Sequence, residues 1–590
     1  MRATRPSRDL VWLVPILAIY FGFLIGGRAL WSPAEGRYAE IAREMAVSGD
    51  YVTPRLNGVK YFEKPPLFYW LEAFSVKLAG VSETALRFWP ALFAVLGCVA
   101  MYAAGRALFD ARTGMLAAVV LATSPLYYAL GRIVAVDMVF TFFFSAGMLA
   151  FLLGTLRPAG PARRKLMWTF YIAAALATMT KGLLGIVLPG LIIGVWLALL
   201  GDWKILKQVH LLSGVALVVL ITAPWHLLVA ARNPEFARFY FIEGQVGRYA
   251  GAEEGGLQWW IYVPVLLIGM FPWIVFAVQA CREALEFPWK RRGDYRVELF
   301  LFLWALLTFL FFSSAASKLF TYVLPVLPPL ALLIARGFSR LWEAKVSRGM
   351  LYGAAAAAAA MLLFVWLDLG GVQYALERYS NWPSLEMPSD DATLPATASP
   401  TRLDVARLRP YLYGQAAVLL LGAVATGILA RRRNVRGVFV ALALTGGLFL
   451  TVVDAGFPLL DDRRSVKHLA LALKPRLNPG DEVATYRAYY QDLPAYLERI
   501  VTVVEWRGEL DFGARAEDTG GWMIDEPEFR RRWSSGRRVY AFTDRENYEK
   551  LKKEMGASVY LIVGNDYNVV VTNHPPAERE AAQTLDLASR

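Results

Sequence analysis

Long apolar runs recur through most of this 590-residue chain and decide what it can fold into. From Leu10 to about Phe457, stretches of roughly 18 to 22 residues are each long enough to cross about 30 Å of hydrocarbon as a helix. A helix satisfies its own backbone hydrogen bonds, as a bilayer core requires. The sequence therefore predicts an α-helical polytopic membrane protein with about thirteen transmembrane helices. The expected spans are 10–30, 84–105, 114–130, 136–155, 166–180, 183–200, 209–230, 258–280, 297–315, 320–336, 349–369, 411–430 and 437–457.

The distribution of charge predicts the orientation of these spans. The net charge of +13 is compatible with a nucleic-acid partner, but the basic residues occupy alternate short loops and form no single patch. By the positive-inside rule these loops are cytoplasmic, so the N-terminus is expected inside. An odd number of spans then leaves the C-terminus outside. We expect no nucleic-acid partner.

The sequence indicates neither a cleaved signal peptide nor a metal site made of Cys or His residues. The first span has basic residues before it but no small-residue cleavage pattern after it, so it is expected to be an uncleaved signal anchor. Cys98 and Cys281 are far apart in apolar surroundings, and no disulfide or Cys metal site is expected. The four histidines lack ligand spacing, so no His-rich metal site is predicted.

The loop 31–83 is far longer than a turn between two spans requires, and is rich in charges and aromatic residues. Two amphipathic helices in the membrane interface are predicted there. Tyr38, Ile41 and Met45 form the apolar stripe of the first, with its charged residues facing elsewhere. Leu67, Trp70, Leu71 and Phe74 keep helical spacing in the second. Two further outer loops are expected, at 231–257 and at 370–410, the latter flexible.

The composition changes after Asp461, where charges return and apolar runs shorten. This pattern predicts a small periplasmic α/β domain over 458–575, followed by a disordered tail at 576–590. It has no Gly-rich phosphate loop, so a cap or docking module is the expectation. The expected strands are 483–486, 501–505, 539–543, 559–563 and 569–572, and the expected helices lie near 465–474, 526–534 and 545–555.

Ionisable residues at the outer ends of spans are the candidates for chemistry, because charges near bilayer depth are costly. A sugar carried on a polyprenyl phosphate needs cations to hold the phosphate and stabilise the charge that develops on it. The candidate cations are Arg37, Arg55, Lys64, Lys181, Arg248 and Lys318. It also needs a carboxylate to orient the acceptor or take its proton, and the candidates are Glu35, Glu63 and Asp137.

Each of these residues also has a purely structural interpretation. A single Arg or Lys at the end of a span is more often an anchor whose charge reaches the interface, and this interpretation is favoured for Arg132 and Arg55. The clustering of both signs of charge on one face, with Glu63 and Lys64 beside two prolines, is harder to explain by anchoring alone.

These residues carry a resemblance to a known family. The run EGRYAEIAREMAVSGDYVTPRLNGVKYFEKPPLFYW resembles the first periplasmic loop of the protein-mannosyltransferase-like GT-C membrane glycosyltransferases, whose well-known relatives transfer 4-amino-4-deoxy-L-arabinose from undecaprenyl phosphate to lipid A. The resemblance continues through RIVAVDMVF, MTKG, SKLFTYVLP and PGDEVATYRAYYQDLPAYL. It implies a GT-C catalytic domain over 1–457. It further implies that Arg37, Lys64, Lys181 and Tyr322 engage the carrier phosphate, that Glu63 is an acidic or metal-contacting residue, and that Asp137 is a second functional acid.

Two positions depart from the family pattern. Ala34 stands where the family usually has Asp, which leaves Glu35 or Asp137 as the candidate base; an anionic acceptor would scarcely need one. Gln245 stands where aminoarabinose transferases resemble a His, and Gln is the weaker ligand for a transition metal. A divalent metal is therefore possible but no obligatory metal is expected.

The sequence thus predicts an inner-membrane glycosyltransferase that takes a sugar from a polyprenyl phosphate such as undecaprenyl phosphate. The expected acceptor is lipid A or another envelope glycolipid, and direct displacement of the lipid phosphate is expected to invert the anomeric carbon. One alternative is transfer to protein or polysaccharide. Others are a transporter of lipid-linked sugars, which the absence of a convincing internal repeat disfavours, and a non-catalytic homologue, which Ala34 keeps open.

Overall fold

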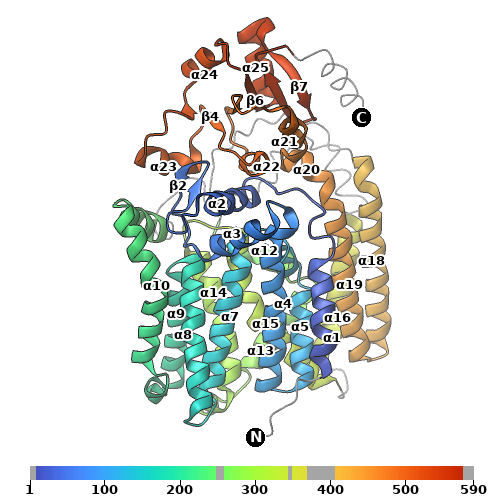
Figure 1. The fold of residues 1–590 in the computed structure, drawn as a ribbon. Coiled ribbons are helices and arrows are strands. Elements are labelled where there is room, and N and C mark those ends of the chain that lie inside the picture. Colours follow the sequence, from blue (N-terminus) through green and yellow to red (C-terminus); the bar gives the residue numbers. More distant parts are fainter. Residues whose placement is uncertain (1–7, 248–257, 343–347, 368–404, 576–590) are drawn as a thin grey trace.

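A helical bundle carries a smaller sheet domain on one end in the computed structural model (Figure 1). The structure describes residues 8–247, 258–342, 348–367 and 405–575. The predicted tail and most of the loop predicted over 370–410 lie outside this range; residues 405–410 belong to the helix α18 (Val405–Arg431). We call the end of the bundle that bears the sheet domain the domain end.

The bundle is built from the predicted spans. Within the described residues eight helices are long and apolar enough to cross a membrane, or nine if the pair α12 and α13, bent by 106°, forms one span. The other predicted spans overlap α8 and the shorter helices α1, α5 and α9, so every predicted range overlaps a helix, although 10–30 extends beyond the end of α1 at Gly22. The bundle helices are α1 (Arg8–Gly22), α4 (Glu83–Leu108), α5 (Ala111–Ala122), α6 (Pro125–Leu130), α7 (Val136–Thr155), α8 (Pro161–Lys181), α9 (Leu184–Leu200), α10 (Leu211–Arg232), α12 (Tyr262–Gly269), α13 (Ile274–Leu285), α14 (Arg296–Ser314), α15 (Leu327–Leu341), α16 (Arg348–Trp366), α18 and α19 (Val435–Gly456).

Two helices and a hairpin form a layer between the bundle and the sheet domain. They are α2 (Ala34–Ser48), α3 (Leu67–Ala79) and the pair β1 (Arg55–Leu56) and β2 (Val59–Lys60). Phe74 on the predicted stripe of α3 is 54% exposed, as suits an interfacial helix. Tyr38 on the apolar stripe of α2 packs on α3, whereas Arg37 faces the sheet domain, and every residue from Glu35 to Met45 is buried. The sheet domain covers the second face of this helix (Figure 1).

The sheet domain contains one six-stranded sheet in the order β5-β4-β3-β6-β8-β7. β5, β4, β3 and β6 run parallel, and β8 pairs antiparallel with both β6 and β7. Five strands and three helices match the predicted ranges, and the two-residue β5 was not predicted. The elements are α20 (Asp461–Arg464), α21 (Lys467–Leu473), β3 (Glu482–Tyr486), α22 (Leu493–Leu497), β4 (Thr502–Val504), α23 (Asp511–Ala516), β5 (Met523–Ile524), α24 (Glu526–Trp533), β6 (Val539–Asp544), α25 (Arg545–Met555), β7 (Tyr560–Gly564) and β8 (Asn568–Thr572).

Buried hydrogen bonds hold the sheet domain against the layer beneath it. The side chain of Asn57 donates to the carbonyl of Val501 and accepts from its amide, each at 2.9 Å. The carboxylate of Asp492 accepts from the hydroxyls of Ser32 and Ser465, each at 2.6 Å. The backbone of Asp492 also lies so close to Gly36 that a Cβ there would come within 2.4 Å of the Asp492 amide nitrogen. Only glycine permits this approach of α2 to the sheet domain.

Candidate active site

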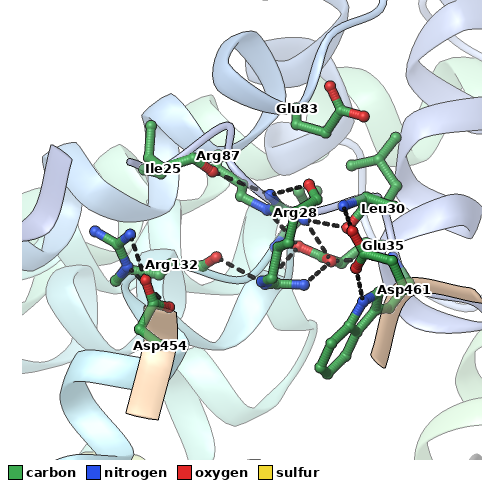
Figure 2. Close-up of polar contacts among 12 residues, drawn as sticks. Ile25, Arg28, Leu30, Glu35, Glu83, Arg87, Arg132, Asp454 and Asp461 are labelled. Carbon is green, nitrogen blue, oxygen red and sulfur yellow. Dashed lines mark hydrogen bonds and ion pairs between the residues drawn. The ribbon is translucent and has the colours of Figure 1, made fainter. Parts of the chain in front are cut away.

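Glu35, at the start of α2, accepts hydrogen bonds from two buried arginines (Figure 2). Nη1 of Arg28 lies 2.6 Å from one carboxylate oxygen, and Nε and Nη2 of Arg87 lie 2.8 Å from the two oxygens. The backbone amides of Trp31 and Val134 add a bond each, at 3.1 Å. This carboxylate joins the segment that follows α1, the start of α4 and the segment that leads into α7.

The network continues to Arg132 and to the last helix of the bundle (Figure 2). Arg28 donates to the carbonyl of Arg132, whose side chain forms an ion pair of 2.8 Å with Asp454 of α19. The Arg132 guanidinium also donates to the carbonyls of Phe21 and Phe23 at the end of α1. Arg132 is thus a buried structural cation, and not a side chain that reaches the interface.

The surroundings of Glu35 fix its protonation state. Burial would raise the pKa of this carboxyl, but the charges of Arg28 and Arg87 and their hydrogen bonds outweigh it and lower the pKa to about 2. A carboxylate with so low a pKa is a very weak base near neutral pH. The geometry therefore favours a positioning role for Glu35 over the predicted catalytic one.

Arg37 lies two residues further along α2 and points its guanidinium at residues from two parts of the fold. Nη1 donates to the hydroxyl of Tyr61 at 3.1 Å, Nε donates to Oε1 of Gln491 at 3.2 Å, and Nη2 forms an ion pair of 2.7 Å with Glu509. Gln491 and Glu509 both belong to the sheet domain. The predicted phosphate-binding arginine is therefore oriented largely by residues that are far away in sequence, Gln491 being 454 positions from it.

Asp137 and Lys181 form a buried ion pair between the first turn of α7 and the last turn of α8. Nζ of Lys181 also lies 4.1 Å from the centroid of the Tyr322 ring, in the 3₁₀ segment Phe320–Val326. The face of an aromatic ring attracts a cation, so Tyr322 helps to hold this ammonium group. Three residues predicted from separate motifs thus meet at one point.

Packing joins this point to the segment that carries Tyr61, Glu63 and Lys64. Phe62 shares a buried cluster with Met179, two residues before Lys181, and Phe512 of the sheet domain packs on the same cluster. The Lys181 end of α8 is therefore at the domain end of the bundle. The pKa of Arg37 is raised well above its ordinary value despite burial, chiefly by the charge of Glu509 and also by that of Glu63, so Glu63 lies near Arg37.

A cavity of about 650 Å³ lies between the layer, the sheet domain and the segment that follows α10. Among the described lining residues, Glu63 is the one that was predicted as a site residue. Glu63 lines it on the side of the layer, and Glu509 and Phe512 line it on the side of the sheet domain. Other lining residues come from the segment that begins at Pro234 and continues as the π-helical stretch Arg238–Gly247. The charged wall and adjoining aromatic cluster suit a polar head group attached to an apolar chain.

The remaining predicted cations lie in other settings. Arg55 binds Glu517 of the sheet domain through two contacts of 2.9 Å, which ties the β1–β2 hairpin to that domain. Lys318 donates to the carbonyl of Ala315 beside the segment of Tyr322. Arg248 lies outside the described residues. A role of these three cations in phosphate binding stays a prediction.

The residues that could hold a metal ion are few. No group of three His, Cys, Asp or Glu side chains comes together in the described part of the chain. Gln245 stands where the family pattern implies a histidine, and an amide oxygen is a weak ligand for a transition metal. The prediction of no obligatory metal therefore rests on the sequence alone.

Sequence reasoning missed four residues of this site. Arg28 and Arg87 sit at the ends of apolar spans, where a basic residue is a common anchor, and Gln491 and Glu509 belong to the sheet domain. Gln491 falls within the motif QDLPAYL, which is part of the family resemblance. That motif was the one signal that connected the sheet domain to the site.

Both the bundle and the sheet domain match models of known protein families. The sequence model of the dolichyl-phosphate-mannose-protein mannosyltransferase family matches residues 10–240. The sequence model of the aminoarabinose transferase C-terminal domain family matches residues 469–573. The undecaprenyl phosphate-α-4-amino-4-deoxy-L-arabinose arabinosyl transferase of Pectobacterium carotovorum is 30% identical over 539 residues, 88% of each chain. The protein of the same name from Edwardsiella ictaluri is 34% identical over 331 residues, 56% of this chain and 59% of that relative.

Solved structures extend the comparison to the fold. ArnT from Cupriavidus metallidurans bound to undecaprenyl phosphate is 29% identical, with a TM-score of 0.81 over 97% of this chain and 100% of that chain. The oligosaccharyltransferase of Archaeoglobus fulgidus, 13% identical with a TM-score of 0.53 over 96% of this chain and 75% of its own, shares the fold alone.

A polytopic helical bundle with this fold and this group of charges at one end defines a membrane glycosyltransferase of the GT-C class. The relative from Pectobacterium carotovorum, which aligns with this chain over 88% of both proteins, identifies the family within this class. The chain belongs to the family of undecaprenyl phosphate-α-4-amino-4-deoxy-L-arabinose arabinosyl transferases.

Proposed function

We propose that this glycosyltransferase takes a sugar from undecaprenyl phosphate and attaches it to lipid A or a related envelope glycolipid. One observation carries the proposal: Asp137, Lys181 and Tyr322 meet at the domain end of the bundle, where packing links them to the segment of Glu63 and Lys64. The name of the family supports an aminoarabinose donor. The bound carrier in the Cupriavidus metallidurans structure supports undecaprenyl phosphate.

In this proposal Arg37, Lys64 and Lys181 bind the carrier phosphate. The anomeric carbon exchanges its bond to the phosphate oxygen for a bond to the acceptor oxygen, and the carrier leaves as a phosphate monoester. Negative charge develops on the departing phosphate, and cations already held in position stabilise it without reorganisation. The Asp137 carboxylate and the ring of Tyr322 together fix the position of the Lys181 ammonium group. A single displacement inverts the configuration.

The need for a general base depends on the acceptor. The carboxylate of Glu35 is bound by two arginines and has a pKa of about 2, so Asp137 or Glu63 remains as the group able to take a proton. A phosphate acceptor is already ionised and requires no base. Ala34, in place of the family Asp, fits such an anionic acceptor.

The proposed setting is the inner membrane of a bacterium, with the N-terminus in the cytoplasm and the sheet domain in the periplasm. The positive-inside distribution of Arg and Lys supports this orientation. It puts the cavity on the face where lipid A of the inner membrane is accessible from the periplasm.

The test is mass spectrometry of lipid A and of other envelope glycans from a deletion strain complemented with variants. We expect the wild-type gene to restore a sugar-sized mass on lipid A, and Lys64→Ala and Asp137→Asn to fail. Lys474→Ala, which removes an ion pair with Glu498 on the sheet domain, is the matched control and should restore it. Loss of sugar from glycoprotein or polysaccharide, with lipid A unchanged, would refute lipid A as the acceptor. No change in any glycan would refute the transferase activity.

A further inference from the structure

Glu509 stands where the carrier phosphate is proposed to bind. It lies in the segment Gly508–Leu510, and its carboxylate is 2.7 Å from Nη2 of Arg37. The two side chains are only 4% and 9% exposed, so little water screens the pair. Glu509 also lines the cavity, on the wall opposite the layer that carries Glu63.

A neutral ion pair attracts an anion far less than an isolated cation does. An ion pair with Glu509 therefore reduces the pull of Arg37 on any phosphate that enters the cavity. The cavity wall adds to this effect, because five of its described lining residues are acidic and two are arginines. The acidic residues are Glu63, Glu235, Glu243, Glu509 and Asp511.

The proposed reaction changes the charge of the carrier. The donor is a phosphodiester with one negative charge, whereas the product is a monoester whose second ionisation falls near pH 6. A site made only of cations would therefore bind the product more tightly than the donor. Such a site would be inhibited by its own product, and carrier release would limit turnover.

We infer that Glu509 is a positioning residue that offsets the charge of Arg37 and so promotes release of the carrier phosphate after transfer. This inference rests on the proposed function, because it takes Arg37 as a phosphate-binding residue. It gives the sheet domain a part in the reaction cycle: the domain orients Arg37 through Gln491 and moderates its charge through Glu509.

The test measures binding of undecaprenyl phosphate to the purified full-length protein. Glu509→Gln keeps the size of the side chain and removes its charge, and we expect it to tighten binding about tenfold. Single-turnover transfer should be at least as fast as in wild type, because the uncovered charge of Arg37 also stabilises the departing phosphate, while steady-state turnover falls and a burst of product precedes it. A purely structural role would instead slow both measurements together.

Three further variants make the outcomes distinguishable. Glu526→Gln removes a carboxylate that pairs with Arg487 within the sheet domain, and its affinity should equal wild type. Arg37→Gln should weaken binding, and Arg37→Gln combined with Glu509→Gln should show no tightening relative to Arg37→Gln alone. If Arg37→Gln weakens binding but Glu509→Gln does not tighten it, only the role of Glu509 is refuted. If Arg37→Gln leaves binding unchanged, the proposed phosphate site is refuted as well.

Discussion

Arg87, in the first turns of α4, donates to the Glu35 carboxylate from Nε and Nη2, each at 2.8 Å. Its other donors reach the carbonyls of Ile25, Arg28 and Ala29, so one fully buried side chain fastens α2 and the end of α1 to the bundle. Removing one partner of such a pair leaves a buried charge without compensation. The Glu35–Arg87 contact therefore holds the start of α2, two residues before Arg37.

We predict that Glu35→Gln destabilises the protein by about 3 to 5 kcal/mol, because it leaves two buried arginines without their counter-charge. Thermal unfolding of the detergent-purified protein measures this loss. The fraction that remains folded should keep transferase activity within a few-fold of wild type. A variant as stable as wild type but inactive would instead make Glu35 a catalytic residue.

The same carboxylate predicts a dependence of stability on acid. The pKa of Glu35 is lowered on folding, from an ordinary 4.5 to about 2, so its stabilising contribution is complete above pH 4.5 and is lost as the pH falls towards 2. Unfolding midpoints measured from pH 6 down to pH 3 should fall more steeply for wild type than for Glu35→Gln. Equal slopes would contradict the assigned pKa.

A second buried carboxyl should behave in the opposite way. Glu72 of α3 is fully buried, and neither of its oxygens has a hydrogen-bond partner among the described residues. Burial raises its pKa well above the usual range, and the charge of Glu35 adds to the effect, so folding is opposed at pH values above the ordinary pKa. We predict that Glu72→Gln raises the unfolding midpoint at pH 7.5 and has little effect near pH 4. Destabilisation at pH 7.5 would show that the carboxyl has a favourable partner.

The ring of Tyr322 is predicted to act through its face. Tyr322→Phe keeps a surface for the Lys181 ammonium, so its activity should stay within about threefold of wild type, whereas Tyr322→Leu should lose about tenfold, equivalent to roughly 1 to 2 kcal/mol of cation–π attraction. Initial rates with saturating donor compare the two. An equal loss in both variants would assign the effect to the hydroxyl, and so to the contact with the carrier that the family resemblance implies.

The close contact between Gly36 and Asp492 predicts that α2 tolerates no side chain at position 36. In Gly36→Ala the new Cβ would meet the backbone of Asp492, and the resulting clash should cost about 1 to 3 kcal/mol and loosen the domain. Limited proteolysis should cut the variant faster between the bundle and the sheet domain, with a matching loss of activity. Gly480→Ala is the control, since nothing lies within 4 Å of its Cβ position.

The local features of the chain could be predicted from sequence, and its distant pairings could not. Apolar length was enough to find the spans, because a helix in a bilayer needs no partner to satisfy its backbone. Alternation of short apolar runs was enough for β3, β6 and β8, but β5 has only two residues and no pattern of its own. Asp137 and Lys181 were found one by one, as charged positions at span ends, and Tyr322 was found through the family resemblance.

The partners of Arg37 and Glu35 could not be predicted in the same way. Nothing in the sequence near Arg37 indicates Gln491 or Glu509, since the contact depends on how a separately folded sheet docks. Arg87 was hidden for another reason: near the start of a span it has the pattern of an anchor, although it is fully buried. Predicting these contacts requires the packing of α2 between two bodies, which composition and periodicity do not encode.

The docking of Gln491 and Glu509 on Arg37 has a consequence for protein engineering. The change of composition near Asp461 is an obvious place to join halves from different relatives, yet a cut there separates an arginine from the two side chains that orient it. A chimaera built at this junction would exchange residues of the candidate active site along with the sheet domain. Matching Gln491 and Glu509 to the new membrane half is therefore the first requirement for such a hybrid to turn over.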